Sequence, residues 1–167
     1  MADKAIAALA EDHITREEQV RRFRALLNEH FAVKTIGRWV LGRYWRKATK
    51  KERGEYLTLF EELIVATYVD RFTKYSGETL SVVSTAPKGK KDTMVFSHIK
   101  RLDGDPPLKV NWRVRMLKGG HRIVDVMVEG ISMGQTQRSE FASVIRKNGG
   151  KIEGLLSELR ERAKLDV

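Results

Sequence analysis

LKVNWRVRML, at residues 108–117, alternates large apolar and polar side chains from end to end. A period of two predicts a strand with one apolar and one polar face. The glycine pair at 119–120 is a two-residue hairpin signal, and residues 121–130 predict the returning strand. We expect that strand to place a set of valines on one face: Val124, Val126 and Val128.

The sequence on either side of this hairpin completes an α+β pattern. Strand-like segments at 79–86 and 92–101 precede it, so we predict a four-stranded antiparallel sheet. Before them, apolar residues recur with a helical period. Two capping boxes, Thr15 with Glu18 and Thr49 with Glu52, mark helix starts. The expected helices lie at 3–11, from 15, at 34–43, about 50–75, 136–147 and 151–164.

The order of these elements predicts helices packed on the apolar face of a twisted sheet, with the other face in water. Length and the lack of a Pro- or Ser-rich linker predict one domain over residues 1–167. Its expected parts are an N-terminal helical segment (1–14), a helical part (15–77), the sheet (78–133) and C-terminal helices (134–167).

Composition limits the chemistry. Cysteine is absent, which excludes disulfides, thiolate catalysis and cysteine-based zinc sites. No apolar run approaches the ~20 residues of a membrane span. Lys plus Arg is 32 and Asp plus Glu is 22, so the net charge is +10 and favours anionic partners. Nucleic acid, anionic headgroups and an acidic protein all satisfy that preference.

Basic residues concentrate between positions 16 and 53, where Trp39, Tyr44 and Trp45 are interleaved. This surface can contact nucleic acid, lipid headgroups or an acidic partner, or can simply be solvated. No recognised nucleic-acid module is present. We expect Tyr44 and Trp45 to pack rather than to bind.

Candidate catalytic groups are few. The four histidines have neither metal-ligand nor catalytic spacing. Asp125 and Glu129 could serve as an acid/base pair. We favour ion pairs with Arg113 and Arg115 across the hairpin instead. The apolar residues of the sheet either fill a core or line a cavity, and periodicity does not separate these alternatives.

Two longer stretches resemble a known family. The first is GRWVLGRYWRKAT at 37–49, followed by Glu52-Arg53 and a long helix that ends near Tyr75-Ser76-Gly77. The second is DVMVEGISM at 125–133, followed by Arg138 and Phe141. In this order and separation the motifs are similar to those of the MlaC, or toluene-tolerance auxiliary, family. The resemblance covers residues from about 16 to 162.

That resemblance implies an NTF2-like roll with an apolar cavity between sheet and helices. It also implies a soluble, monomeric periplasmic carrier with phospholipid as cargo, no metal or cofactor and no catalysis. Such carriers shuttle glycerophospholipid between an outer-membrane lipoprotein–porin complex and an inner-membrane ABC transporter complex that contains an MCE-domain protein, and so maintain outer-membrane lipid asymmetry. No signal peptide is visible, so a periplasmic location presumes a leader missing from this sequence.

The resemblance also suggests residues that contact the lipid: Tyr68, Leu108 and Ile131 first, then Val110, Trp112, Val126 and Val128, with Val40, Leu41 and Phe72 as helix-side walls. Expected contacts to headgroup or partner are Arg38, Arg43, Arg46 and Lys47. Two other functions remain open at this stage. One is an NTF2-like acid/base enzyme using Asp125 inside the cavity, and the other is a basic nucleic-acid-binding module.

Overall fold

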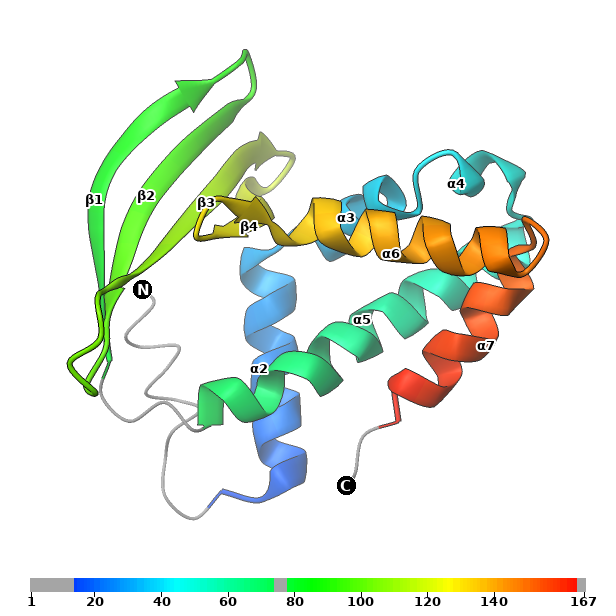
Figure 1. The fold of residues 1–167 in the computed structure, drawn as a ribbon, viewed down its shortest axis with the longest axis horizontal. Coiled ribbons are helices and arrows are strands. Elements are labelled where there is room, and N and C mark those ends of the chain that lie inside the picture. The colour runs from blue at the N-terminus through cyan, green and yellow to red at the C-terminus, as the bar shows by residue number, and fades with distance from the viewer. Residues whose placement is uncertain (1–13, 74–77, 165–167) are drawn as a thin grey trace.

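The computed structural model describes residues 14–73 and 78–164, apart from the side chains of 71–73. A curved sheet and a group of helices stand side by side, and the first two strands lie farthest from the helices (Figure 1). The helix expected at 3–11 falls outside the described residues. No described helix has the length and hydropathy needed to cross a bilayer.

Helices occupy both ends of the described chain. Before the sheet come α2 (Arg16–His30), α3 (Val33–Leu41), α4 (Tyr44–Lys47) and α5 (Lys50–Thr73), and after it come α6 (Met133–Lys147) and α7 (Ile152–Arg162). The capping box before α5 is confirmed: Thr49 Oγ1 accepts from the amide of Glu52 at 3.2 Å, and Glu52 accepts from the amide of Thr49 at 2.7 Å. At α2 the amide of Glu18 bonds Thr15, but the Glu18 carboxylate binds Arg21 and Arg22 instead. The second half of that box is therefore missing.

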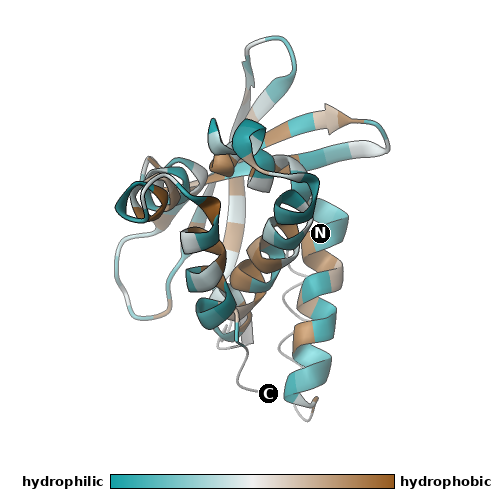
Figure 2. Cartoon of the chain, turned by 90° about the vertical axis from the view of Figure 1, so that its right-hand side faces the viewer, coloured by the Kyte–Doolittle hydropathy of each residue, from teal (hydrophilic) through white to brown (hydrophobic). Residues whose placement is uncertain are grey.

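The main core is formed by helices alone. Its buried members include Leu27 of α2, Leu41 of α3, Tyr56 of α5 and Leu156 of α7. Figure 2 shows the hydrophobic positions of the helices gathered toward the inside of the bundle. At its centre the rings of Tyr56 and Phe60 meet the edge of Phe141 at centroid distances of 6.2 and 6.3 Å. Tyr56 also donates a hydrogen bond to the carbonyl of Gly37 at 2.9 Å, which satisfies its buried hydroxyl.

Five strands, rather than the predicted four, form one antiparallel sheet within the described residues. They are β1 (Thr79–Lys88), β2 (Asp92–Lys100), β3 (Leu108–Leu117), β4 (Gly120–Val128) and β5 (Ile131–Ser132), and they are hydrogen-bonded in this order. β5 has only two residues, too few to show a period in the sequence. β4 also differs from its prediction. Arg113 pairs with Asp125 and Val114 pairs with Ile123, so Val124 sits in a bulge and interrupts the expected alternation of valines.

Arg113 and Arg115 do form ion pairs, but the predicted partners Asp125 and Glu129 are wrong. Both guanidinium groups bind the carboxylate of Asp92 on β2, Arg115 Nε at 2.6 Å from Oδ1, rather than Asp125 or Glu129. Asp92 opposes Arg115 directly in the β2–β3 register, which explains this choice. The hydrogen bond from Arg115, assisted by Arg113, lowers the pKa of Asp92 to about 2.

We expect the substitution Asp92→Asn to lower the free energy of unfolding at pH 7 by about 2 kcal/mol. The folded-state pKa of Asp92 lies below its usual value of 3.8, so its contribution is complete above that value and is lost as the pH falls toward 2. The difference between wild type and variant should therefore shrink between about pH 5 and pH 2 in denaturant titrations. The control is Asp105→Asn, at an exposed ion pair, which should change stability little. A difference for Asp92→Asn that is independent of pH would contradict this account.

Candidate functional site

One face of the sheet is apolar across four strands. Residues directly opposite one another in an antiparallel ladder share a face, and the register places Val95, Trp112 and Val126 in one such row. The neighbouring rows extend the set in both directions. We call this set the apolar sheet face: Leu80, Val82, Val95, Ile99, Leu108, Val110, Trp112, Val126 and Val128.

The apolar sheet face is not absorbed into the helical core. Within the described part of the chain, the core cluster and the residues packed on it contain none of its members. Val110 is buried, but most of the others are only half-buried, and Val82 is 59% exposed. An extended apolar surface that the described residues cover only in part is typical of a binding site rather than of a finished core.

A polar link holds the largest side chain of this face in place. The indole Nε1 of Trp112 donates to the hydroxyl of Ser97 at 2.9 Å, and that hydroxyl donates to the carbonyl of Val110. Ser97 is fully buried, so both groups are satisfied without water. Trp112 therefore presents its apolar ring surface while its one polar atom is already paired.

The other predicted lipid-contacting residues are divided. Ile131 of β5 opposes Val128 and sits at the edge of the apolar sheet face, 60% exposed. Tyr68 of α5 is half-buried against the helical core. Val40 and Leu41 are buried in that core, and the structure does not group them with the strands. The side chain of Phe72 lies outside the described residues.

Asp125 lies on the face of the sheet opposite to the apolar sheet face, so it does not point into the expected cavity. In the ladder it stands directly across from Arg113. Its carboxylate accepts hydrogen bonds from Ser132 Oγ at 2.6 Å and from the amide of Gly134 at 3.1 Å. Gly134 leaves room for this contact, because a Cβ there would stand 3.0 Å from Asp125 Oδ1 and 2.9 Å from the Trp39 ring. Asp125 thus ties β4 to the start of α6, which is a structural role.

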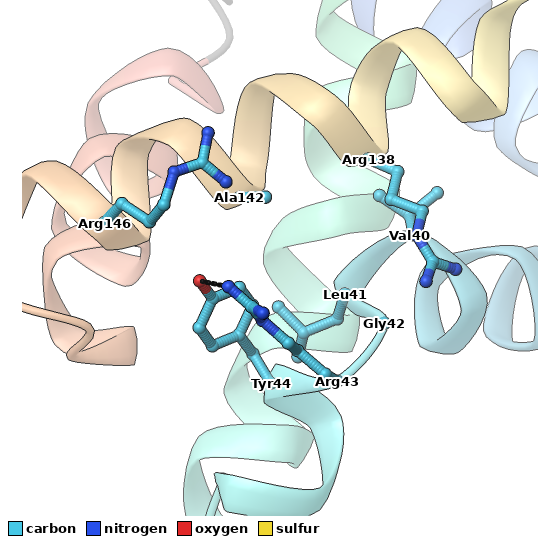
Figure 3. Close-up of a pocket in the computed structure, with 8 residues that line it drawn as sticks. All are labelled: Val40, Leu41, Gly42, Arg43, Tyr44, Arg138, Ala142 and Arg146. Carbon is cyan, nitrogen blue, oxygen red and sulfur yellow. Dashed lines mark hydrogen bonds between the residues drawn. The ribbon is translucent and has the colours of Figure 1, made fainter.

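A second feature is a cationic cleft between the α3–α4 turn and α6. Its volume is about 290 Å³, and Figure 3 shows the residues that line it: Val40, Leu41, Gly42, Arg43, Tyr44, Arg138, Ala142 and Arg146. Arg43 donates a hydrogen bond to the hydroxyl of Tyr44 at 3.1 Å. That bond is the largest cause of a lowered Tyr44 pKa, and the positive charges of Arg146 and Lys47 add to it.

The other three predicted cations are exposed on α3 and α4 and are not among the residues that line the cleft. The Arg38 guanidinium stands 5.7 Å from the ring centroid of Trp45, and the Lys47 ammonium stands 5.9 Å from that of Tyr44. Arg46 is exposed. The prediction that Tyr44 packs is confirmed, since it is 4% exposed and belongs to the helical core.

Comparison with known proteins relates this chain to a family. The family model described as MlaC protein matches residues 1–161. This chain belongs to the MlaC family. It is 24% identical over 134 residues to the intermembrane phospholipid transport system binding protein MlaC of Haemophilus influenzae, a match that spans 78% of this chain and 62% of that protein.

The fold of this MlaC-family chain also matches a solved structure. The phospholipid-binding protein of Ralstonia solanacearum, determined in complex with a phospholipid, superposes with a TM-score of 0.83. The match covers 97% of this chain and 92% of that one at 23% identity. The predicted α+β roll is therefore confirmed, with the strand count corrected.

Two cleft residues of this family member were missed by the sequence prediction. Arg138 and Arg146 lie on α6 with Ala142 between them, each four residues from the next. This spacing puts all three on one side of a helix. The pattern was visible in the sequence, but nothing in it indicated that the α3–α4 turn would pack opposite. Members of the apolar sheet face on β1 and β2 were missed because strand register is not readable from one sequence.

Gly42 is required by the geometry of the cleft. Its φ of +59° favours glycine, and a Cβ there would stand 3.0 Å from the Arg138 guanidinium. We expect Gly42→Ala to lower the free energy of unfolding by about 1–3 kcal/mol, measured by thermal or chemical denaturation. Gly89→Ala is a suitable control for backbone strain, because Gly89 also has positive φ but has open space around it. Equal losses in the two variants would mean that the contact with Arg138 adds nothing.

Proposed function

We propose that this protein is a soluble periplasmic phospholipid carrier whose acyl-chain contacts lie on the apolar sheet face. The observation that carries the proposal is that face itself, which remains half-buried beside a helical core that is complete without it. Membership of the MlaC family and similarity to the intermembrane phospholipid transport system binding protein of Haemophilus influenzae support the same assignment.

Burial on this face can bind an acyl chain without recognising a particular headgroup. Each buried methylene contributes about 0.8 kcal/mol, so acyl chains bind without polar recognition. Val110, Trp112, Val126 and Val128 form the centre of the proposed contact, with Leu108 and Ile131 at its margins. Tyr68 on α5 is proposed to approach the lipid from the helical side, and the contact expected of Phe72 stays a prediction.

The same proposal extends to partners and to the nature of the activity. We infer exchange of phospholipid with an outer-membrane lipoprotein–porin complex and with an inner-membrane ABC transporter complex containing an MCE-domain protein. The protein acts as a monomer and without catalysis. Arg38, Arg46 and Lys47, which are exposed around α3 and α4, are proposed to contact headgroups or acidic partner surfaces.

Uptake of lipid from vesicles tests this function. Delipidated protein is mixed with vesicles that contain labelled phosphatidylglycerol and is then separated from them by size exclusion. We expect labelled lipid to elute with the protein, and to remain with it after a wash in high salt, because burial rather than charge holds the chains. Label that elutes only with vesicles, or that leaves the protein in salt, would overturn the proposal.

A further inference from the structure

The cationic cleft contains more positive charge than its surroundings balance. Arg43, Arg138 and Arg146 border it, and none of them forms an ion pair with a carboxylate of the described residues. Val40, Leu41 and Ala142 supply an apolar floor. Guanidinium groups that border one space without a carboxylate repel each other, so an anion bound there would reduce this electrostatic repulsion.

Many other arginines of the described chain do have a carboxylate partner. Those on α2, on β3, on α7 and in the β2–β3 loop bind carboxylates: Arg16, Arg21, Arg22, Arg24, Arg101, Arg113, Arg115, Arg160 and Arg162. The described arginines without a carboxylate partner lie mostly around α3, α4 and α6, with Arg53 on α5 and Arg122 on β4 bonded to backbone carbonyls instead. The cleft is therefore a place where three arginines without a carboxylate partner among the described residues border one space.

Two of the three guanidinium groups are held in place before any ligand arrives. Arg138 Nη1 donates to the carbonyl of Trp39 at 2.9 Å, and its guanidinium stands 5.1 Å from the Trp39 ring centroid. Arg43 is held by the hydroxyl and ring of Tyr44, which is itself buried. Each guanidinium has five N–H groups, so these contacts leave donors for a ligand.

We propose that the cationic cleft is a binding site for a phosphate group, supplied either by a free phosphate or by an anionic lipid headgroup. Planar guanidinium forks match phosphate oxygens in pairs, and several forks around one space favour a multiply charged oxyanion. In Figure 3 Arg138 extends from α6 toward Gly42, Arg43 lies beside the ring of Tyr44, and the guanidinium of Arg146 lies beside Ala142.

This site is distinct from the apolar sheet face. Arg146 lies in the last turn of α6, about 20 Å along the helix from its start beside β5. In Figure 1 α4 lies at the end of the bundle away from the strands, whereas α3 begins near β4. The inference therefore goes beyond the carrier function, and the two can fail separately.

Titration with inorganic phosphate at constant ionic strength tests the site, with backbone amide NMR shifts as the readout. We expect saturable shifts at residues 40–44 and 138–146. Double substitution R43A/R146A should weaken phosphate binding by about tenfold or more. R43K/R146K, which keeps the charge but loses the forks, should also weaken it. The control K90A/K91A removes the same charge from the exposed β1–β2 turn and should bind as wild type does.

A second arm identifies the source of the phosphate. If the source is a lipid headgroup, phosphatidylglycerol vesicles retain wild type and K90A/K91A in sedimentation but release R43A/R146A. If it is a free phosphate, vesicle retention of both double variants falls equally while the soluble titration still separates them. Shifts that never saturate, or soluble and vesicle binding that both double variants lose to the same extent, would overturn the proposal. Lipid content of the purified variants, measured alongside, reports on the carrier function independently.

Discussion

Replacing Val126 with aspartate should remove most phospholipid from the purified protein while its helices stay folded. Val126 opposes Trp112 at the centre of the apolar sheet face and lies outside the helical core. A carboxylate there must lose its hydration wherever an acyl chain covers it, which costs several kcal/mol. We therefore expect lipid retention to fall by about two orders of magnitude or more. The measurement is lipid per protein after purification, by mass spectrometry of extracts.

The matched control for Val126→Asp is Asn111→Asp. Asn111 lies beside Trp112 on β3 and pairs with Met127, so its side chain is on the opposite face of the sheet. It adds the same negative charge to the same ladder. Circular dichroism and melting curves establish that both variants fold. Equal loss of lipid in the two variants, or full retention of lipid in Val126→Asp, would show that the apolar sheet face does not hold the phospholipid.

The second large effect is expected on stability, at Phe141. This side chain is 1% exposed on α6 and packs edge-on against Tyr56 and Phe60. Truncation to alanine leaves a cavity among rings that cannot close over it, so Phe141→Ala should cost about 3–5 kcal/mol. For a chain of this length that lowers the melting temperature by roughly 10 °C.

Phe141→Ala also tests whether the core and the lipid contacts are separate. Below its transition the variant should keep its lipid, because Phe141 belongs to the helical core and not to the apolar sheet face. The exposed substitution Ser139→Ala on the same helix should leave the melting temperature nearly unchanged. A Phe141→Ala variant that melts with wild type, or that is folded but empty of lipid, would show that the two regions are not organised as described.

Local patterns predicted much of this fold. The alternation in 108–117 located β3 at its observed bounds, and the Thr49–Glu52 capping box located the start of α5. These signals act over a few residues and need no knowledge of neighbours. Gly42, with its positive φ, ended α3 two residues earlier than the helical pattern at 34–43 suggested.

What failed depended on distant partners. Asp92 binds Arg113 and Arg115 because β2 pairs with β3. The sequence favoured Asp125 and Glu129 as their partners, because these acids lie on the strand that follows the hairpin. The bulge at Val124 and the two-residue β5 arise from sheet geometry and carry no periodic signal. Arg138 and Arg146 become part of a cleft only because α6 packs against the α3–α4 turn, which the sequence did not indicate. Val40 and Leu41 were predicted as helix-side walls of the lipid cavity, whereas they belong to the helical core and line the cleft.

The central claim is that the apolar sheet face holds phospholipid, and its most direct test is mass spectrometry of an organic extract of the purified protein. The account predicts glycerophospholipid in an amount comparable with that of the protein. An extract that contains no lipid, and that stays free of lipid after the protein has been incubated with vesicles, would contradict it.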